Sequence, residues 1–207
     1  MYELGPPFSG VSVPLGTNIL LSGPPLAGKR WLAMETLAVG ARGEGSIVVS
    51  TRDSADRVRE AWVPLVDEGT AVAVVDAITQ HIGRTTDAEM TKYAASPRDL
   101  SDIGVKFSEY IQSFYTEQQR EHNRVVVDSL TTLLLYSNLQ TVFRFLHVFT
   151  SRVGSVDGLG LYTVDATAHD GETLSTLDQL FDATIDIDAD GTATLTLPDG
   201  DTRTATL

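Results

Sequence analysis

Cysteine is absent from this sequence of 207 residues, and lysine occurs only at Lys29, Lys92 and Lys106. Without cysteine the chain can form no disulfide and no thiolate metal site. No apolar run approaches the roughly 20 residues that a membrane span needs. The first residues also lack the basic start and apolar stretch of a signal peptide. We therefore expect a soluble protein of the cytoplasm with no membrane partner.

The shortage of lysine leaves a large excess of acid. The chain has 28 Asp and Glu against 15 Lys and Arg, a net charge of −13. Acid is spread through the chain and Asp outnumbers Glu, which favours a cytoplasm of high salt, where self-repulsion is screened. An acidic interaction surface for a partner is the alternative. Because phosphate neutralisation needs clustered Lys and Arg, tight binding to DNA is disfavoured.

Residues 19–40 form the stretch with the clearest chemical meaning. An apolar run at 19–21 leads into a glycine-bounded loop and Lys29, and a helix-forming segment follows. This order is the context that a phosphate-binding loop of pattern G-x-x-x-x-G-K requires. Glycines let successive N–H groups turn toward an anion, and the helix start and the lysine add positive charge. A plain turn with an exposed lysine is the alternative. The predicted nucleotide-binding residues are Gly23, Pro24, Pro25, Leu26, Ala27, Gly28, Lys29, Arg30 and Trp31.

The residue after Lys29 departs from this pattern. A Ser or Thr hydroxyl normally ligates Mg²⁺ there, but Arg30 stands in its place. A guanidinium only donates hydrogen bonds and cannot be a metal ligand. Arg30 would either offset phosphate charge or point to solvent. Nucleotide binding can survive this change, whereas metal-assisted hydrolysis is in doubt.

The rest of the chain predicts one α/β domain over residues 1–207, with a mostly parallel sheet flanked by helices. Residues 1–16 are rich in proline and glycine and predict an irregular lead-in or a short edge strand. Apolar, β-branched runs and helical periodicity then alternate. The predicted strands are 17–22, 46–51, 71–76, 124–128 and 159–164. The predicted helices are 29–41, 54–65, 100–119, 139–153 and 174–181, with Ser54 and Thr173 as N-caps of two of them.

Two segments break this alternation. Residues 183–207 hold three short β segments separated by Asp190-Gly191 and Asp199-Gly200. Such pairs are hairpin signals, so we predict an antiparallel meander at the edge of the sheet. Residues 77–97 are polar and irregular and predict a mobile loop. That loop includes Gly83, Arg84, Thr85, Thr86 and Asp87.

Two aspartates follow predicted strands at the edge where the phosphate-binding loop lies. Asp128 ends the run Val125–Val127, and ligands bind at the carboxyl ends of strands in doubly wound sheets. Asp128 is the predicted Mg²⁺ site, directly or through water, with a turn or cap aspartate as the alternative. Asp53 follows the second strand beside Arg52. It could orient water as a general base or cap the next helix, and the sequence leaves both open.

Other titratable groups carry weaker signals. Asp165 and His169 follow the strand at 159–164 and could sense a γ phosphate, although a solvent histidine is the more ordinary reading of His169. His81, His122 and His147 have no partner spacing for metal or triad chemistry. The four histidines do not form a zinc pattern.

These segments together resemble the RecA-superfamily ATPases of the KaiC type. The segments are GPPLAGKR at 23–30, GEGSIVVSTRDSADRV at 43–58, RVVVDSLTTLLLY at 124–136 and LFDATIDI at 180–187. Residues 96–109 look more like the haloarchaeal KaiC-like group labelled HTR-like proteins. The resemblance covers nearly the whole chain and implies a RecA-like core that binds ATP through residues 23–30. It also implies that Asp128 stands where the family has the second aspartate of its phosphate site.

The resemblance also shows where this sequence departs from the catalytic residues of the family. In KaiC-type domains two adjacent glutamates after the second strand activate water, and the matching positions here are Arg52 and Asp53. One acid has become a base and the other is shorter, in addition to Arg30. We therefore expect an ATP-binding regulatory or signalling module with weak or no hydrolysis, acting through a protein partner. An active Mg-dependent ATPase with Asp53 as base and Asp128 as metal anchor is the alternative. Related domains assemble into rings or filaments, so a homo-oligomer is a further expectation.

Overall fold

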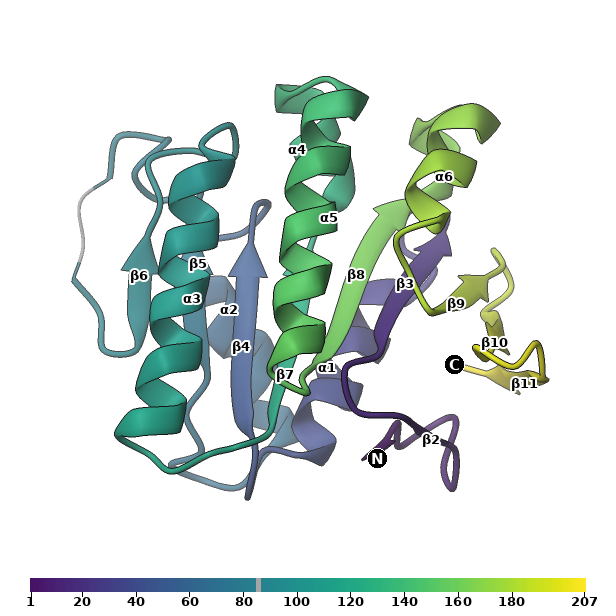
Figure 1. Ribbon diagram of the computed structural model, residues 1–207, viewed down its shortest axis with the longest axis horizontal. Helices are drawn as coiled ribbons and strands as arrows, with labels where there is room; N and C mark the ends of the chain where they lie inside the picture. Colours follow the sequence, from purple (N-terminus) through teal and green to yellow (C-terminus); the bar gives the residue numbers. More distant parts are fainter. Residues whose placement is uncertain (85–86) are drawn as a thin grey trace.

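The structure is a computed structural model that describes residues 1–84 and 87–207. A nine-stranded sheet runs through the molecule, with helices on both of its faces (Figure 1). The strand order is β11-β10-β9-β3-β8-β7-β4-β5-β6. β3 to β9 are parallel where they pair, and β10 and β11 add antiparallel strands after β9. The predicted mostly parallel sheet and C-terminal meander are therefore confirmed.

The elements follow the predicted alternation with small shifts at their ends. The strands of the sheet are β3 (Asn18–Gly23), β4 (Gly45–Ser50), β5 (Ala73–Asp76), β6 (Thr91–Tyr93), β7 (Asn123–Asp128), β8 (Leu159–Asp165), β9 (Ala183–Ile187), β10 (Thr192–Thr196) and β11 (Thr202–Thr206). The helices are α1 (Lys29–Val39), α2 (Ala55–Trp62), α3 (Leu100–Thr116), α4 (Leu130–Tyr136), α5 (Leu139–Ser155) and α6 (Gly171–Asp178). Short 3-10 turns follow α2 at Val63–Leu65 and β8 at Ala166–Ala168.

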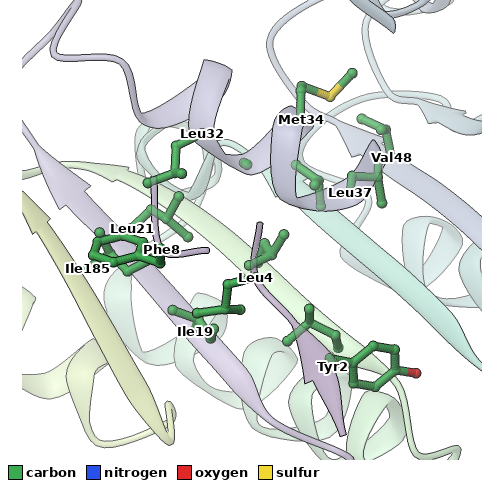
Figure 2. Close-up of a cluster of buried hydrophobic side chains, with 14 of the residues drawn as sticks. Tyr2, Leu4, Phe8, Ile19, Leu21, Leu32, Met34, Leu37, Val48 and Ile185 are labelled. Atoms are coloured by element: carbon green, nitrogen blue, oxygen red, sulfur yellow. The ribbon is translucent and has the colours of Figure 1, made fainter. Parts of the chain in front are cut away.

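Two apolar layers cover the two faces of the sheet. Helices α1 and α2 and the N-terminal residues pack on one face, and α3, α4 and α5 pack on the other (Figure 1). Figure 2 shows the first layer, in which Tyr2, Leu4 and Phe8 lie among side chains of β3 and α1. Strand β4 faces both layers, because Val48 points to the first and its neighbours Ile47 and Val49 to the second. None of the helices among the described residues is both long enough and apolar enough to cross a membrane.

Three local predictions need correction. The lead-in at 1–16 is neither irregular throughout nor an edge strand of the main sheet. It contains β1 (Tyr2–Glu3) and β2 (Ser12–Val13), which pair with each other in a separate antiparallel sheet. The N-cap of α6 is Asp170, whose carboxylate accepts the N–H of Thr173 at 2.8 Å, so Thr173 is not the cap.

The third correction concerns the loop predicted at 77–97. Residues 91–93 form β6, which pairs with β5 in parallel and ends the sheet on that side. The strand has three residues, too few to show a period in the sequence. Thr85 and Thr86 of the predicted loop lie outside the described residues.

Candidate functional site

The strand order brings the candidate residues to one edge of the sheet. Strands β3, β8, β7 and β4 are neighbours and parallel, so their carboxyl ends lie together. Gly23 at the end of β3 is in register with Asp165 of β8, and Ser50 of β4 is in register with Asp128 of β7. The loop at 23–29, both predicted aspartates and Arg52 therefore meet where parallel sheets bind ligands.

The glycine-bounded loop ends in backbone that only some residues adopt easily. Gly28 has φ +96° and forms the N-cap of α1, and Leu26 has φ +63°. Within the described residues no side chain caps the N-terminus of α1. The first-turn N–H groups of an α-helix have no partner inside the helix, and the helix dipole is positive there. This end of α1 can therefore receive an anion.

Lys29 lies across the loop rather than away from it. Its Nζ donates to the carbonyl oxygens of Gly23 at 2.7 Å and of Pro24 at 2.5 Å. Burial lowers the pKa of Lys29, because the charged form loses water. A phosphate group would compete with these two carbonyls for the ammonium group.

Gly23 is needed for close packing as well as for the loop. A Cβ atom at this position would lie 2.4 Å from the carbonyl oxygen of Ile187 in β9. The first glycine of the motif therefore lets β3 and the end of β9 approach each other. This requirement is structural and is independent of any ligand.

Arg30 points into the site and contacts two carboxylates. Its Nη1 forms an ion pair with Oδ2 of Asp53, and its Nε lies 3.6 Å from Oδ2 of Asp128. Arg52 also approaches Asp53, with 3.5 Å between Nε and Oδ2. The side chain of Arg30 is 24% exposed, so the predicted alternative of a solvent-directed arginine does not hold. Burial lowers the pKa of Arg30, since partial desolvation disfavours its charged form.

Asp128 is buried, with one carboxylate oxygen hydrogen-bonded and the other facing a guanidinium group. Thr163 of β8 donates its hydroxyl to Oδ1 at 2.8 Å, and Oδ2 faces Arg30. The backbone carbonyl of Asp128 accepts the N–H of Thr51 at 2.8 Å, which ties β7 to the end of β4. Thr163 was missed in the sequence because nothing there shows that β8 lies next to β7.

Asp53 does not cap α2. Ser54 is the N-cap residue, as predicted, and the N–H of Ala55 is bonded to Oδ2 of Asp76 at 2.7 Å. Asp76 is fully buried and also accepts from Ile78 and Thr79. Ser54 holds the N-cap position without a side-chain capping bond, Asp76 accepts the first N–H of α2, and the carboxylate of Asp53 is turned to Arg30 instead.

The carboxylates suggest Mg²⁺, but the set as a whole does not fit that ion. The hydroxyl ligand is missing at Arg30, and the guanidinium lies against Asp128, the predicted metal ligand, as well as against Asp53. Two unit charges 4 Å apart repel by about 4 kcal/mol at an effective dielectric constant of 20, so a divalent ion there would be repelled by about twice that. Among the described residues no group of three or more His, Asp or Glu side chains is arranged to hold a metal.

A pocket of about 370 Å³ lies over these residues. Its lining consists of Pro25, Leu26, Gly28, Lys29, Arg30, Trp31, Arg52, Asp128, Ser129, Thr163, Val164 and Asp165. Most of the predicted nucleotide-binding residues are therefore brought together. Gly23, Pro24 and Ala27 are not in the lining, and Gly23 and Pro24 hold Lys29 through their carbonyls. Trp31 and Leu26 expose much of their apolar surface beside the pocket.

Asp165 and His169 are placed differently from each other. Asp165 lines the pocket, but its Oδ1 accepts the N–H and the hydroxyl of Thr167, so it holds its own turn. The ring of His169 contacts the hydroxyl of Thr131 at 3.3 Å. His81 lies against Tyr136 and His122 against Tyr2, which leaves the four histidines apart from one another.

A larger hollow lies elsewhere. A groove of about 760 Å³ separates α3 from α5, and its lining includes Val105, Phe145 and Val148. It holds no glycine-bounded loop and no strand end. The volume of a pocket therefore does not identify the functional site. The site is identified by the loop, the helix start and the charged groups, which meet at one edge of the sheet.

Comparison with known proteins supports the fold. No curated protein matches the chain. Among solved structures, the KaiC-like protein PH0186 from the hyperthermophilic archaeon Pyrococcus horikoshii OT3 superposes with a TM-score of 0.64 at 15% identity. The match covers 95% of this chain and 85% of that chain, and it confirms the predicted RecA-like fold. A family model matches residues 16–187, so the chain belongs to DUF7504, a family of unknown function.

Proposed function

We propose that this protein binds ATP at the loop of residues 23–29 and hydrolyses it weakly or not at all, as a nucleotide-responsive regulatory or signalling module. The single observation that carries the proposal is the geometry at the start of α1. A glycine-bounded loop, an uncapped helix start and Lys29 converge there on a pocket beside Asp128. Backbone N–H groups at a helix start and a lysine are what phosphate binding requires.

Weak hydrolysis follows from the partners of Asp53. A general base must reach the attacking water, and Asp53 is paired with Arg30 and lies near Arg52. Its carboxylate is therefore directed to guanidinium groups and not to an attacking water. The alternative of an active ATPase requires Asp53 to leave this pairing.

Binding can be tested with the protein's own fluorescence. Trp31 is 45% exposed at the pocket, whereas Trp62 is buried on α2 and bonded to Thr70. Titration with ATP in concentrated KCl should therefore change the emission of Trp31 alone, and Trp31→Phe should abolish the signal. Lys29→Ala should weaken binding while the fold is retained. Lys92→Ala is the matched control, since Lys92 lies on the edge strand β6 and pairs with Glu109 of α3.

Turnover separates the two readings. If the wild type released phosphate at well above roughly one per minute, and Lys29→Ala abolished that release, the regulatory reading would be wrong. If no adenine or guanine nucleotide changed the emission of Trp31 or gave heat in calorimetry, nucleotide binding itself would be wrong.

The setting of this function is also part of the proposal. The acidic composition supports a haloarchaeal protein of the cytoplasm, and the resemblance of residues 96–109 supports the HTR-like group. Leu26 and Trp31 expose apolar surface at the mouth of the pocket, which suits a second copy or a signalling partner that closes over the nucleotide. Light scattering with and without ATP, in high salt, tests whether self-association depends on nucleotide.

A further inference from the structure

Arg30 lies between Asp128, the predicted Mg²⁺ site, and Asp53, the predicted general base. Its guanidinium contacts Asp53 through Nη1 and faces Asp128 through Nε. In the usual site the metal bridges the residue after the lysine and an aspartate at the end of a neighbouring strand. Here the residue after the lysine reaches that aspartate with its own positive charge.

Building on the proposed function, we propose that Arg30 is the built-in cation of this nucleotide site, so that the protein binds the triphosphate without a divalent metal. A guanidinium has five N–H donors, and among the described residues Asp53 accepts a hydrogen bond from Nη1 while Asp128 lies 3.6 Å from Nε. The remaining donors can bind phosphate oxygens bidentately, as arginine does at many phosphate sites.

The charges of the site agree with this assignment. Arg30 and Arg52 carry one positive charge each, the same total as one Mg²⁺ ion. Arg52 lines the pocket and lies 3.5 Å from Asp53, so both arginines share the same carboxylate. Lys29 remains to approach the phosphates from the loop. The positive charges that phosphate binding needs are therefore all supplied by side chains of this chain.

Asp128 is held in a way that suits an arginine partner rather than a metal. Its Oδ1 accepts from Thr163 at 2.8 Å and its Oδ2 faces Arg30, and the side chain is only 5% exposed. A carboxylate this buried needs a compensating charge. Arg30 provides that charge, so a metal would have to displace a side chain of the same chain.

The test compares ATP binding with and without metal. Wild-type protein is titrated with ATP in concentrated KCl, once with Mg²⁺ and once with EDTA, and binding is followed by Trp31 fluorescence and by calorimetry. We expect the two dissociation constants to agree within about threefold. Binding that weakens about tenfold or more in EDTA overturns the proposal. Absence of binding in both conditions overturns the proposed function itself, so the two failures are distinguishable.

Arg30→Ser restores the hydroxyl and frees both aspartates. In EDTA this variant should bind ATP at least about tenfold more weakly than the wild type, because Asp128 then faces the phosphates without a cationic partner and Asp53 keeps only Arg52, and Mg²⁺ should restore binding. Equal affinities of this variant in both conditions would overturn the assignment of Arg30. Arg42→Ser is the matched control, as Arg42 pairs with Asp67 on the surface away from the pocket. The comparison on wild-type protein decides the proposal even if Arg30→Ser folds poorly.

Discussion

Arg124 provides a test of how burial sets the strength of an ion pair in this fold. Its Nε lies 2.6 Å from Oε2 of Glu44, and its side chain is 2% exposed. Nη1 also donates to the backbone carbonyls of Glu3 at 2.7 Å and Thr36 at 2.8 Å. The guanidinium stacks over the ring of Tyr2, 5.2 Å from its centroid. One side chain thus joins β7 to the N-terminal residues, to α1 and to the turn before β4.

We predict that Arg124→Ala lowers the free energy of unfolding by about 3 kcal/mol. Removing one partner of a buried pair costs about 3–5 kcal/mol, because the other charge is left without compensation. Glu44 is 24% exposed, so water can partly replace the arginine and the lower end applies. For a chain of this size, that corresponds to a fall in melting temperature of about 6–12 °C.

Arg203→Ala is the matched control. Arg203 pairs with Asp201 at the same distance of 2.6 Å, but both side chains are about half exposed. An exposed pair contributes about 0–1 kcal/mol, and salt screens it. Thermal and urea unfolding of both variants, followed by circular dichroism at fixed KCl, would measure the contrast. Equal losses of stability in the two variants would refute the argument from burial.

Three further predictions concern single positions. Asp76→Asn should lower the free energy of unfolding by about 2–3 kcal/mol in urea denaturation, because the amide replaces one acceptor oxygen by an NH₂ donor, which then faces either the N–H of Ala55 or those of Ile78 and Thr79. An unchanged midpoint would contradict its capping role. Gly28→Ala and Gly10→Ala should each lower the free energy of unfolding by about 1–2 kcal/mol, because alanine is strained at φ +96° and +81°. Only Gly28→Ala should also weaken ATP binding, measured by calorimetry. Because burial lowers the pKa of Lys29 below 10.5 and phosphate favours its protonated form, ATP affinity should fall as pH rises through that pKa. Lys29→Arg, which stays charged, should remove this pH dependence, and a pH-independent wild type would contradict it.

The parts of the fold that were predictable are those with local signals. The loop at 23–29 was found from the order of strand, glycines, lysine and helix, and the meander from its Asp-Gly turns. Strand β6 was missed because three residues carry no period, and the N-cap of α6 was misplaced by three residues because Asp170 and Thr173 are both good capping residues.

The contacts of the candidate site were not predictable in the same way. That Arg30, Asp53 and Asp128 meet depends on β3, β8, β7 and β4 being neighbours in that order, which no local pattern contains. Thr163 becomes part of the site only because β8 lies beside β7. For the same reason Arg124 and Glu44, 80 residues apart in sequence, gave no sign of their pairing.

The unusual residues of the site depend on one another. An arginine after Lys29 with no acidic neighbour would leave a half-buried charge in the pocket, and Asp53 and Asp128 without Arg30 would leave two carboxylates facing bound phosphate. The resemblance to KaiC-type ATPases places a longer glutamate where Asp53 stands, and here the shorter carboxylate pairs with Arg30. Arg52 approaches the same carboxylate of Asp53 and brings the group to two positive and two negative charges. The positions that look like losses from an ATPase therefore form one mutually neutralising group, which argues for a site that still binds nucleotide but no longer needs the metal that drives hydrolysis.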